Sequence, residues 1–138
     1  MKLQIVNKNQ EHIEGFTVIT AKGSEIDLSS VVDNQCELIF APDVMDTFPV
    51  SSLQELVKGL ISKLRLGGEI VLGGTDIRLF CKAVSNAQVP YGDASQMIGA
   101  CSSMTTPDMT ADLLKAFQLS VQNIHINGLH YEVKAKRG

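Results

Sequence analysis

The stretch "CELIFAPDVMDTFPVSSLQELVKGLISKLRLGGEIVLGG", residues 36–74, decides the fold. It begins with a short apolar run, Cys36 to Ala41, and ends with a second run flanked by glycine pairs, Gly67 to Gly74. Short apolar runs of this kind are typical of strands that are buried on both faces of a parallel sheet. The stretch therefore predicts two neighbouring strands and a connection between them.

An amphipathic helix is predicted as that connection. Ser52 and Glu55 have the S-x-x-E spacing of a capping box, in which each side chain bonds a free backbone N–H of the first turn. Apolar residues then fall on one stripe at helical spacing, namely Leu53, Val57, Leu60, Ile61 and Leu64. Gly67 can end the helix in the left-handed conformation. Strand, helix and strand at this spacing form a βαβ unit with a right-handed crossover.

Two further strands are predicted before this unit, Lys2 to Val6 and Gly15 to Ala21. Only about 30 residues separate the first strand from the strand at Cys36. That distance leaves little room for a full first helix or for a regular third strand. The N-terminal half of the domain is therefore predicted to be reduced.

Helices and then a hairpin are predicted after the unit. The helices are expected from Thr75 through Val84, near Ala94 to Ala100, and after Thr106, where Pro107 and Asp108 suit a first turn. Asn127-Gly128 suits a type I′ hairpin turn, which needs positive φ at both central positions. A two-residue turn at these positions places Ile126 opposite Leu129, Ile124 opposite Tyr131, and His125 opposite His130.

Composition limits the classes of function. The 138 residues suit a single domain, 1–138, and the net charge of -3 with a pI of about 5.5 argues against a nucleic-acid partner. No apolar run approaches the ~18 residues that span a bilayer, and no signal-peptide pattern opens the chain. Cys36, Cys81 and Cys101 form neither a disulfide framework nor a metal knuckle, so they are interpreted as small core residues of a cytoplasmic protein.

The order of these elements resembles that of the class I S-adenosylmethionine-dependent methyltransferases, whose sheet ends with a reversed strand. Three stretches carry the resemblance to the small type-11-like members: "EGFTVI" (14–19), "SEIDLSSVVDNQCELIFAPDVMDTF" (24–48) and "LVKGLISKLRLGGEIVLGGTDIRLFCKA" (56–83). The resemblance implies an α/β, Rossmann-like, three-layer fold with a mostly parallel sheet that ends in an antiparallel hairpin. It also implies S-adenosylmethionine as the cofactor.

The resemblance places a candidate cofactor site on this chain. The loop after the first strand, glycine-rich in the family so that its backbone can approach the cofactor, here contains Val6, Asn7 and Asn9 and no glycine. Thr20 stands where an acidic residue would hold the ribose. Asp27 and Leu28 match the pair that reads the adenine, although Asp27 also suits a plain turn. Ala41, at the end of its strand, completes the set.

Several aspartates, the polar residues of the hairpin and three methionines each allow a functional and a structural interpretation. Asp43 and Asp46 follow the strand at Cys36 and could act as a base toward an acceptor, or could simply begin the next turn and helix. Asn123, His125, His130 and Glu132 could share one hairpin face, as a metal site or, as favoured here, as a solvated surface. Met97, Met104 and Met109 suit the core, or else an adaptable contact surface.

Two functions follow from the resemblance and its departures. The chain is predicted to be a degenerate methyltransferase-fold protein, catalytically impaired, that serves as a binding, regulatory or assembly module with a protein partner or as a homo-oligomer. The alternative is an active small methyltransferase that acts on a small-molecule or saccharide-type acceptor. The missing glycines and the missing ribose acid favour the first, because bulky side chains at a site of close approach weaken binding.

Overall fold

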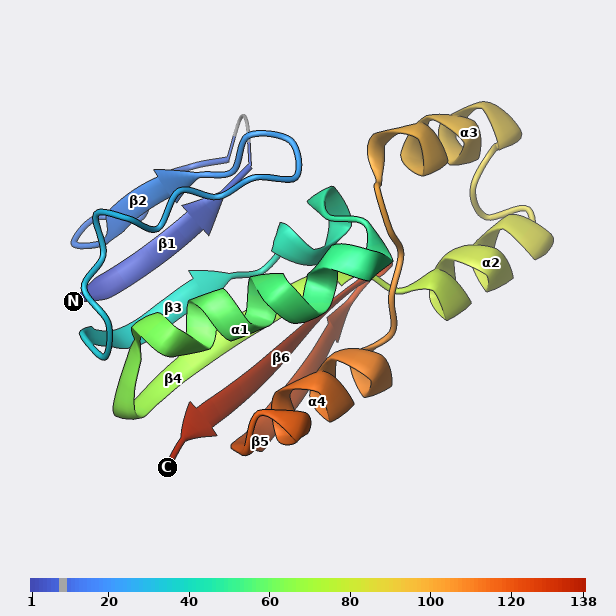
Figure 1. Cartoon of the computed structure of the whole chain (residues 1–138). Coiled ribbons are helices and arrows are strands. Elements are labelled where there is room, and N and C mark those ends of the chain that lie inside the picture. Colours follow the sequence, from blue (N-terminus) through green and yellow to red (C-terminus); the bar gives the residue numbers. More distant parts are fainter. Residues whose placement is uncertain (8–9) are drawn as a thin grey trace.

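The computed structural model describes residues 1–7 and 10–138, and its centre is one six-stranded sheet (Figure 1). The strands are β1 (Lys2–Val6), β2 (Thr17–Thr20), β3 (Cys36–Ala41), β4 (Leu64–Thr75), β5 (Leu119–Asn127) and β6 (His130–Arg137). Their order across the sheet is β2-β1-β3-β4-β6-β5. The strands β1 to β4 pair in parallel, and β6 pairs antiparallel with both β4 and β5. The predicted α/β sheet with a terminal antiparallel hairpin is confirmed.

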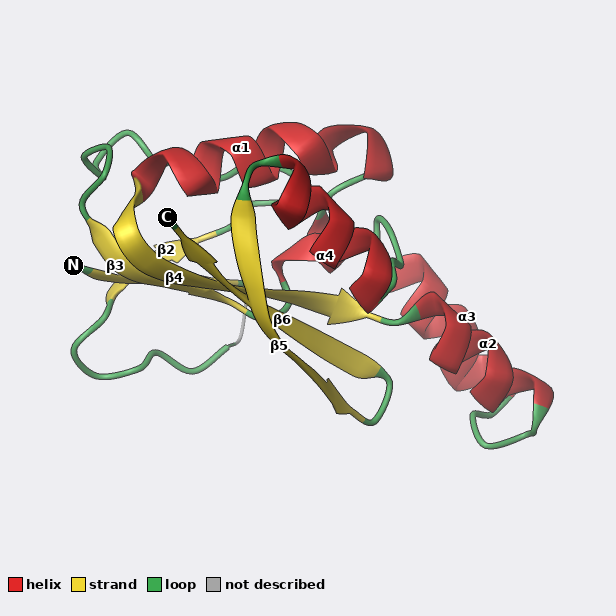
Figure 2. Ribbon diagram, turned by 90° about the horizontal axis from the view of Figure 1, so that it is seen from below, coloured by secondary structure: helices red, strands yellow, loops and turns green. Residues whose placement is uncertain are grey.

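The helices that pack on this sheet lie on one side of it, so the described elements form two layers where three were predicted (Figure 2). The described helices are α1 (Leu53–Lys63), α2 (Ile77–Ser85), α3 (Tyr91–Ala100) and α4 (Pro107–Ala116), with two short 3₁₀ turns, η1 (Val44–Thr47) and η2 (Val50–Ser52). The helices α1 and α4 share one face, whereas α2 and α3 project beyond the end of the sheet. Between β1 and β3 the described residues form a strand but no helix, so the N-terminal half is reduced as predicted. None of the described helices is long and apolar enough to cross a bilayer.

The core lies between α1, α4 and the sheet. The predicted stripe of α1 is confirmed, because Leu53, Val57 and Leu60 are at most 1% exposed. They belong to the same buried cluster as Ile39 of β3 and Ile70 of β4. Full burial of an aliphatic side chain contributes about 1.5–3 kcal/mol, so each of these side chains stabilises the packing of α1 on the sheet by an amount of this order.

The predicted start of α1 is confirmed, with Ser52 as the N-cap residue, but the predicted capping bond and the predicted C-terminal end were wrong. Ser52 has a helical backbone and its side chain makes no capping hydrogen bond, because η2 already precedes the helix and the Ser52 N–H bonds the carbonyl of Pro49. The helix stops at Lys63, and Leu64 begins β4. Gly67 does have a φ of +78°, but it lies within β4, opposite the point where the register with β3 shifts. It accommodates that irregularity and does not end the helix.

The later helices follow the prediction with two shifted starts, since α3 begins at Tyr91, three residues before the predicted Ala94. The helix α2 begins at Ile77 and not at Thr75, because Thr75 still pairs with His130 in the sheet. Asp76 caps α2, since its Oδ1 accepts from the backbone N–H groups of Arg78 and Leu79. The Thr106 cap of α4 is confirmed, with its Oγ1 3.1 Å from the Met109 nitrogen.

The hairpin forms, but its predicted register was wrong by two residues. Asn127 pairs with His130, so Gly128 and Leu129 are the central turn residues. Of these two, only Gly128 has a positive φ, +63°, as a type II′ turn requires. The register places Ile126 opposite Tyr131, Ile124 opposite Val133, and His125 opposite Glu132. A slip of two residues keeps every side chain on its face, so the apolar pattern does not distinguish the two registers.

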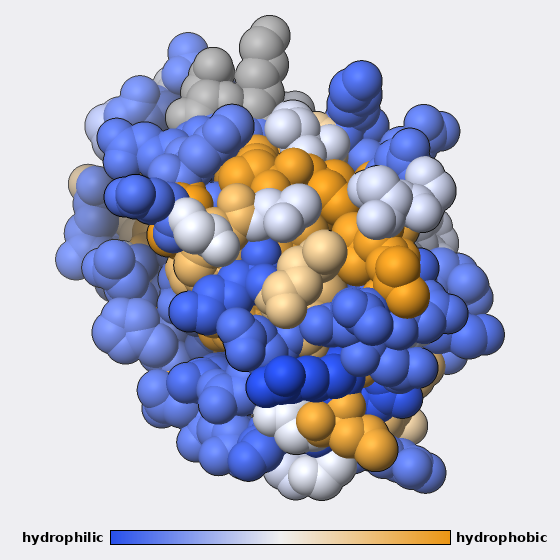
Figure 3. Space-filling model, turned by 90° about the vertical axis from the view of Figure 1, so that its left-hand side faces the viewer, coloured by the Kyte–Doolittle hydropathy of each residue, from blue (hydrophilic) through white to orange (hydrophobic). Residues whose placement is uncertain are grey.

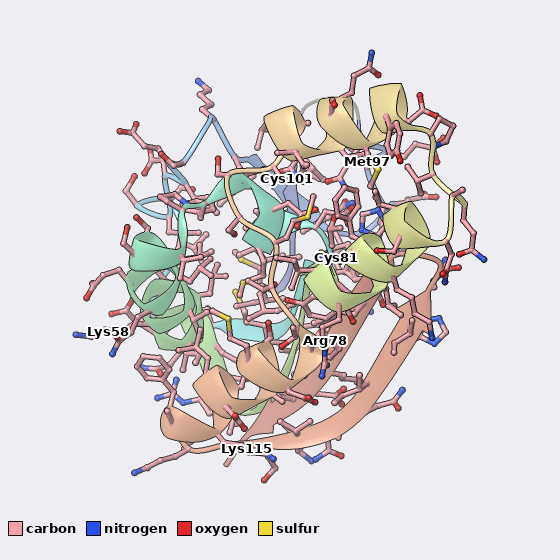
Figure 4. The ribbon with its side chains drawn as sticks, turned by 90° about the vertical axis from the view of Figure 1, so that its right-hand side faces the viewer. Lys58, Arg78, Cys81, Met97, Cys101 and Lys115 are labelled. Atoms are coloured by element: carbon pink, nitrogen blue, oxygen red, sulfur yellow. The ribbon has the colours of Figure 1, made fainter. Side chains whose placement is uncertain are left out.

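The sulfur side chains are less buried than predicted. Cys36 is buried, but Cys81 is exposed and Cys101 is half-buried, and all three thiols are free. Figure 4 shows Cys81, Met97 and Cys101 around the space between α2 and α3. A shallow apolar cavity of about 300 Å³ lies there, lined by Cys81, Cys101 and Met104, among others. The methionines Met97, Met104 and Met109 are half-buried or exposed, so the core interpretation of these residues was wrong.

Candidate functional site

The candidate site lies where β1, β3 and β4 end, at the carboxyl edge of the parallel strands. Open α/β sheets bind their ligands at this edge. Asn7 follows β1, Asp43 and Asp46 follow β3, and Asp76 follows β4. The chain brings these segments together because Gly73 and Gly74 carry no side chain. A Cβ on Gly73 would lie 2.3 Å from the Pro42 carbonyl oxygen, and one on Gly74 would lie 2.8 Å from Asp46 Oδ1.

The loop after β1 is tied to the loop after β3 by side chains. Gln10 Nε2 donates a hydrogen bond to Asp43 Oδ2, and Asn7 Nδ2 donates to the Asp43 carbonyl at 3.4 Å. Gln10 Oε1 also accepts from the Asn7 backbone N–H at 2.7 Å, which fixes the glutamine side chain. Polar side chains thus bridge the loop after β1 and the loop after β3.

Asp43 also faces the hairpin. Its Oδ1 lies 3.6 Å from Nδ1 of His130, whose side chain is 52% exposed. Both residues line a cavity of about 240 Å³ together with His125 and Glu132, which are cross-strand partners. Within residues 1–7 and 10–138, no three His, Cys, Asp or Glu side chains are arranged to hold a metal ion. Among the described residues, the hairpin face therefore does not present the set of ligands that a metal site requires.

Asp46 is held by the end of β4. Its Oδ1 accepts from the Thr75 backbone N–H and its Oδ2 from the Thr75 hydroxyl, each at 2.7 Å. Its backbone carbonyl accepts from the Ser102 N–H at 2.7 Å. Burial raises the pKa of the Asp46 carboxyl, and the two hydrogen bonds from Thr75 offset only part of that effect. Asp46 therefore joins β3, β4 and the segment after α3.

The candidate cofactor residues near β1 have unequal access. Val6 and Ala41 are buried, and the Val6 carbonyl accepts from the Ala21 N–H at 2.8 Å. Asn7 lines a cavity of about 260 Å³ whose other walls are Ala21, Gly23, Thr47, Ala100 and Ser102. Thr20 is exposed at the end of β2. Asn9 lies outside the described residues.

Asp27 and Leu28 lie in a different cleft. They line a space of about 570 Å³ that is closed on its other side by α1, with Leu56 and Gly59. Asp27 Oδ1 accepts from the Ser29 backbone N–H at 3.0 Å, and hydrogen bonds from Ser29 lower the pKa of the Asp27 carboxyl. This cleft and the cavity at Asn7 share no lining residue, so the candidate cofactor residues do not line one common pocket.

No protein-family model and no curated protein matches this sequence. Solved structures do match, and those described here are methyltransferases. An S-adenosylmethionine-dependent methyltransferase from Archaeoglobus fulgidus aligns with a TM-score of 0.60 at 13% identity over 89% of this chain and 68% of its own. One from Methanosarcina mazei aligns with a TM-score of 0.58 at 12% identity over 94% and 70%.

The chain has the fold of the S-adenosylmethionine-dependent methyltransferases. An O-methyltransferase family protein from Burkholderia thailandensis extends the likeness, with a TM-score of 0.62 at 11% identity over 89% of this chain. This chain spans only 36% of that protein, so the methyltransferase fold is shared while the rest of the larger protein has no counterpart here. Identities this low establish the fold alone.

The residues that close the methyltransferase-fold edge were only partly visible in the sequence. Gln10 belongs to the loop that follows the predicted first strand but has no role in the sequence prediction, and His130 appears there as one residue of a hairpin face. Neither could be assigned to Asp43, because the Gln10–Asp43 contact joins residues 33 positions apart. The glycine pair Gly73-Gly74 was the available signal, since paired glycines at a strand end indicate that other backbone approaches closely.

Proposed function

We propose that this chain is a methyltransferase-fold protein whose cofactor loop is closed by its own side chains, and that it acts as a binding, regulatory or assembly module. The observation that carries the proposal is the hydrogen bond from Gln10 to Asp43. It links the two loops between which a methyltransferase would hold the methionine part of its cofactor. The proposal treats residues 1–138 as a single domain.

Crowding at the loop is the physical basis of the proposal. A cofactor that contacts the chain after β1 would have to displace the Asn7 and Gln10 side chains and break their bonds to Asp43. Forcing extra atoms into an occupied space typically costs about 1–3 kcal/mol, and each lost hydrogen bond about 1 kcal/mol more. The cavity beside Asn7, about 260 Å³, is also smaller than the ~300–1,000 Å³ of usual ligand pockets.

The carboxylate of Asp46 supports the same proposal. Both of its oxygens are engaged by Thr75, so a proton acceptor role would compete with two hydrogen bonds that hold β4 in place. We therefore assign Asp46 a structural role in the module. Of the two candidate bases, Asp43 is the one that lines a cavity, and its Oδ1 lies beside His130 there.

A second function, an active small methyltransferase, is favoured by the Asp43–His130 pair. A carboxylate beside Nδ1 can orient a histidine so that its Nε2 accepts a proton from an acceptor hydroxyl or amine. The acceptor would be a small molecule or a saccharide, bound in the cavity that His125 and Glu132 line. Transfer from the sulfonium would then depend chiefly on the alignment of the two reactants.

The proposed setting is a reducing, cytoplasmic one, because all three cysteines are unpaired. The net charge of -3 supports a protein partner rather than a nucleic acid. A protein partner includes a second copy of the same chain. The role of an assembly module needs such a contact surface and does not need the cofactor.

Isothermal titration calorimetry with S-adenosylmethionine and its demethylated product distinguishes the two functions. The proposal predicts no binding heat at millimolar ligand. Micromolar binding that disappears in Asp27→Ala would overturn it and support the enzyme, because Asp27 is the residue matched to adenine recognition. Ser29→Ala serves as the matched control, since it alters the same turn without removing the carboxylate.

A further inference from the structure

The outer edge of β2 is unpaired. This strand is the last one on its side of the sheet, and its single strand partner is β1. The N–H of Ala21, directly after β2, bonds the carbonyl of Val6. Backbone groups alternate in direction along a strand, so those of Ile19 also point to β1 while those of Val18 and Thr20 point outward. Among the described residues, no hydrogen bond reaches these outward groups.

The strand itself carries no protection against pairing. Its sequence is Thr17-Val18-Ile19-Thr20, four β-branched residues without charge or proline. Natural edge strands usually carry lysine, proline or a bulge that discourages pairing with another chain. The opposite edge strand, β5, has such a device, because its register shifts between Val121 and Asn123. In the part of the sheet formed by the described residues, the β2 edge is the one without such a device.

An apolar flank adjoins this edge. Ile19, Ile26 and Leu28 are half-buried and pack against the margin of the core, and Val18, which is also half-buried, lies on the other face of β2. Figure 3 views the molecule from this side and shows apolar atoms gathered at the middle of the face, with hydrophilic atoms around them. A polar rim around an apolar centre is the arrangement of protein contact surfaces. A strand added at β2 would cover part of this flank.

We propose that β2 pairs antiparallel with β2 of a second copy of this chain, so that two sheets join into one. In the register set by the outward groups, the two-fold axis passes beside Ile19. Val18 of each copy then exchanges both backbone hydrogen bonds with Thr20 of the other, which gives four bonds in all. An isologous contact of this kind closes on itself and yields a dimer.

The charges at the two ends of the edge fit this partner. Glu14 lies three residues before β2 and Lys22 two residues after it. Antiparallel pairing brings the start of one strand beside the end of the other, so Glu14 of each copy lies near Lys22 of its partner. Both side chains are exposed, and within the described part of the chain neither forms an ion pair. The two-fold symmetry makes this attraction occur twice.

This dimer specifies the partner of the proposed assembly module and in that respect rests on the proposed function, but it forms whether or not S-adenosylmethionine binds. A four-residue strand supplies few backbone bonds, and the contact area falls at the small end of specific interfaces. We therefore expect a concentration-dependent dimer with micromolar affinity and not a permanent one. Absence of the dimer would be detected as an unchanged molar mass in light scattering. Failure of the proposed function would be detected as a binding heat in the titration with S-adenosylmethionine. The two outcomes can therefore be distinguished.

The first experiment is size-exclusion chromatography with light scattering over a range of protein concentrations. We expect the mass to rise from one toward two copies, and Val18→Lys to weaken the association by ~10-fold or more by placing two like charges near the axis. Val121→Lys is the matched control, a half-buried valine on the opposite edge strand, and should leave the dimer unchanged. Circular dichroism checks that both variants fold.

The second experiment tests the partner's orientation. Glu14→Lys should weaken the dimer several-fold, and Glu14→Lys combined with Lys22→Glu should restore it, because the two charges exchange places. In residue-resolved hydrogen exchange, the amides of Val18 and Thr20 should gain protection as concentration rises, while that of Ala21 is protected throughout. A protein that stays monomeric at every concentration, or a dimer indifferent to Val18→Lys and to the charge exchange, would overturn the proposal.

Discussion

The side-chain amide of Gln10 donates a hydrogen bond to Oδ2 of Asp43, which joins the loop after β1 to the loop after β3. The same carboxylate lies beside His130 through its other oxygen. One residue at the carboxyl edge of the sheet therefore connects the first strand, the third strand and the hairpin. Open α/β sheets bind their ligands at this edge, so under the proposed function the connection stands in place of an interaction with a cofactor.

Removal of the Gln10 side chain should destabilise the protein modestly. In Gln10→Ala, Asp43 Oδ2 and the Asn7 N–H lose their partners, and we expect the free energy of unfolding to fall by about 0.5–1.5 kcal/mol. Urea denaturation measures the change. Gln122→Ala, an exposed glutamine on β5, is the control and should change stability by less than ~0.5 kcal/mol. Equal effects in the two variants would show that the Gln10 bond is not formed in solution.

The buried hydroxyl of Tyr131 should contribute more. Tyr131 is 1% exposed, and its OH is hydrogen-bonded to the hydroxyls of Thr105 and Thr110. In Tyr131→Phe these two buried hydroxyls lose that partner, so we expect a loss of about 1–3 kcal/mol in thermal or urea denaturation. Tyr91→Phe is the matched control, because Tyr91 is 82% exposed and should lose nothing measurable. A Tyr131→Phe protein as stable as the wild type would contradict the network.

Asp46 should make stability depend on pH. Because burial raises its folded pKa above the ordinary 3.8, the folded state holds the proton more tightly than the unfolded state. This carboxyl therefore lowers stability as pH rises from about 3.8 through the folded pKa. Asp46→Asn avoids that loss, so the stability of the variant relative to wild type should rise over this window and then level off, as measured by denaturation at a series of pH values.

Asp27 supplies the opposite sign as a control. Hydrogen bonds from Ser29 lower its folded pKa, so this carboxyl adds stability above the unfolded pKa and loses it as pH falls through the folded value. Asp27→Asn should therefore lose stability relative to wild type as pH rises through the acid range. If the Asp46→Asn difference were independent of pH, or had the same sign as that of Asp27→Asn, the burial of Asp46 would be contradicted.

The sequence predicted elements that depend on local pattern and missed contacts between distant residues. The strands at Cys36 and Gly67 and the helix between them follow from apolar runs and a helical stripe, and the structure has them. The C-terminal end of α1 was missed because Leu64 continues the apolar stripe although it already belongs to β4, and the hairpin register was missed because a two-residue slip leaves the same apolar pattern. The Gln10–Asp43 and Tyr131–Thr105 contacts join residues 33 and 26 positions apart, and no spacing rule connects such pairs.

The three thiols should react in an order set by exposure. Cys81 is exposed, Cys101 is half-buried and Cys36 is buried, and burial raises the pKa of the Cys36 and Cys101 thiols. Since the thiolate is the reactive form, iodoacetamide should modify Cys81 first and Cys36 only on unfolding. Peptide mapping by mass spectrometry over a time course measures the order. Modification of Cys36 at the rate of Cys81 would contradict its position in the core, and pretreatment with urea should abolish the difference.

A crystal structure determined in the presence of millimolar S-adenosylmethionine tests the central claim most directly. The account predicts that the Gln10–Asp43 hydrogen bond is kept and that no ligand density lies against Val6 and Asn7. A cofactor bound against those two residues, with Gln10 turned away from Asp43, would contradict the account and support the alternative of an active methyltransferase.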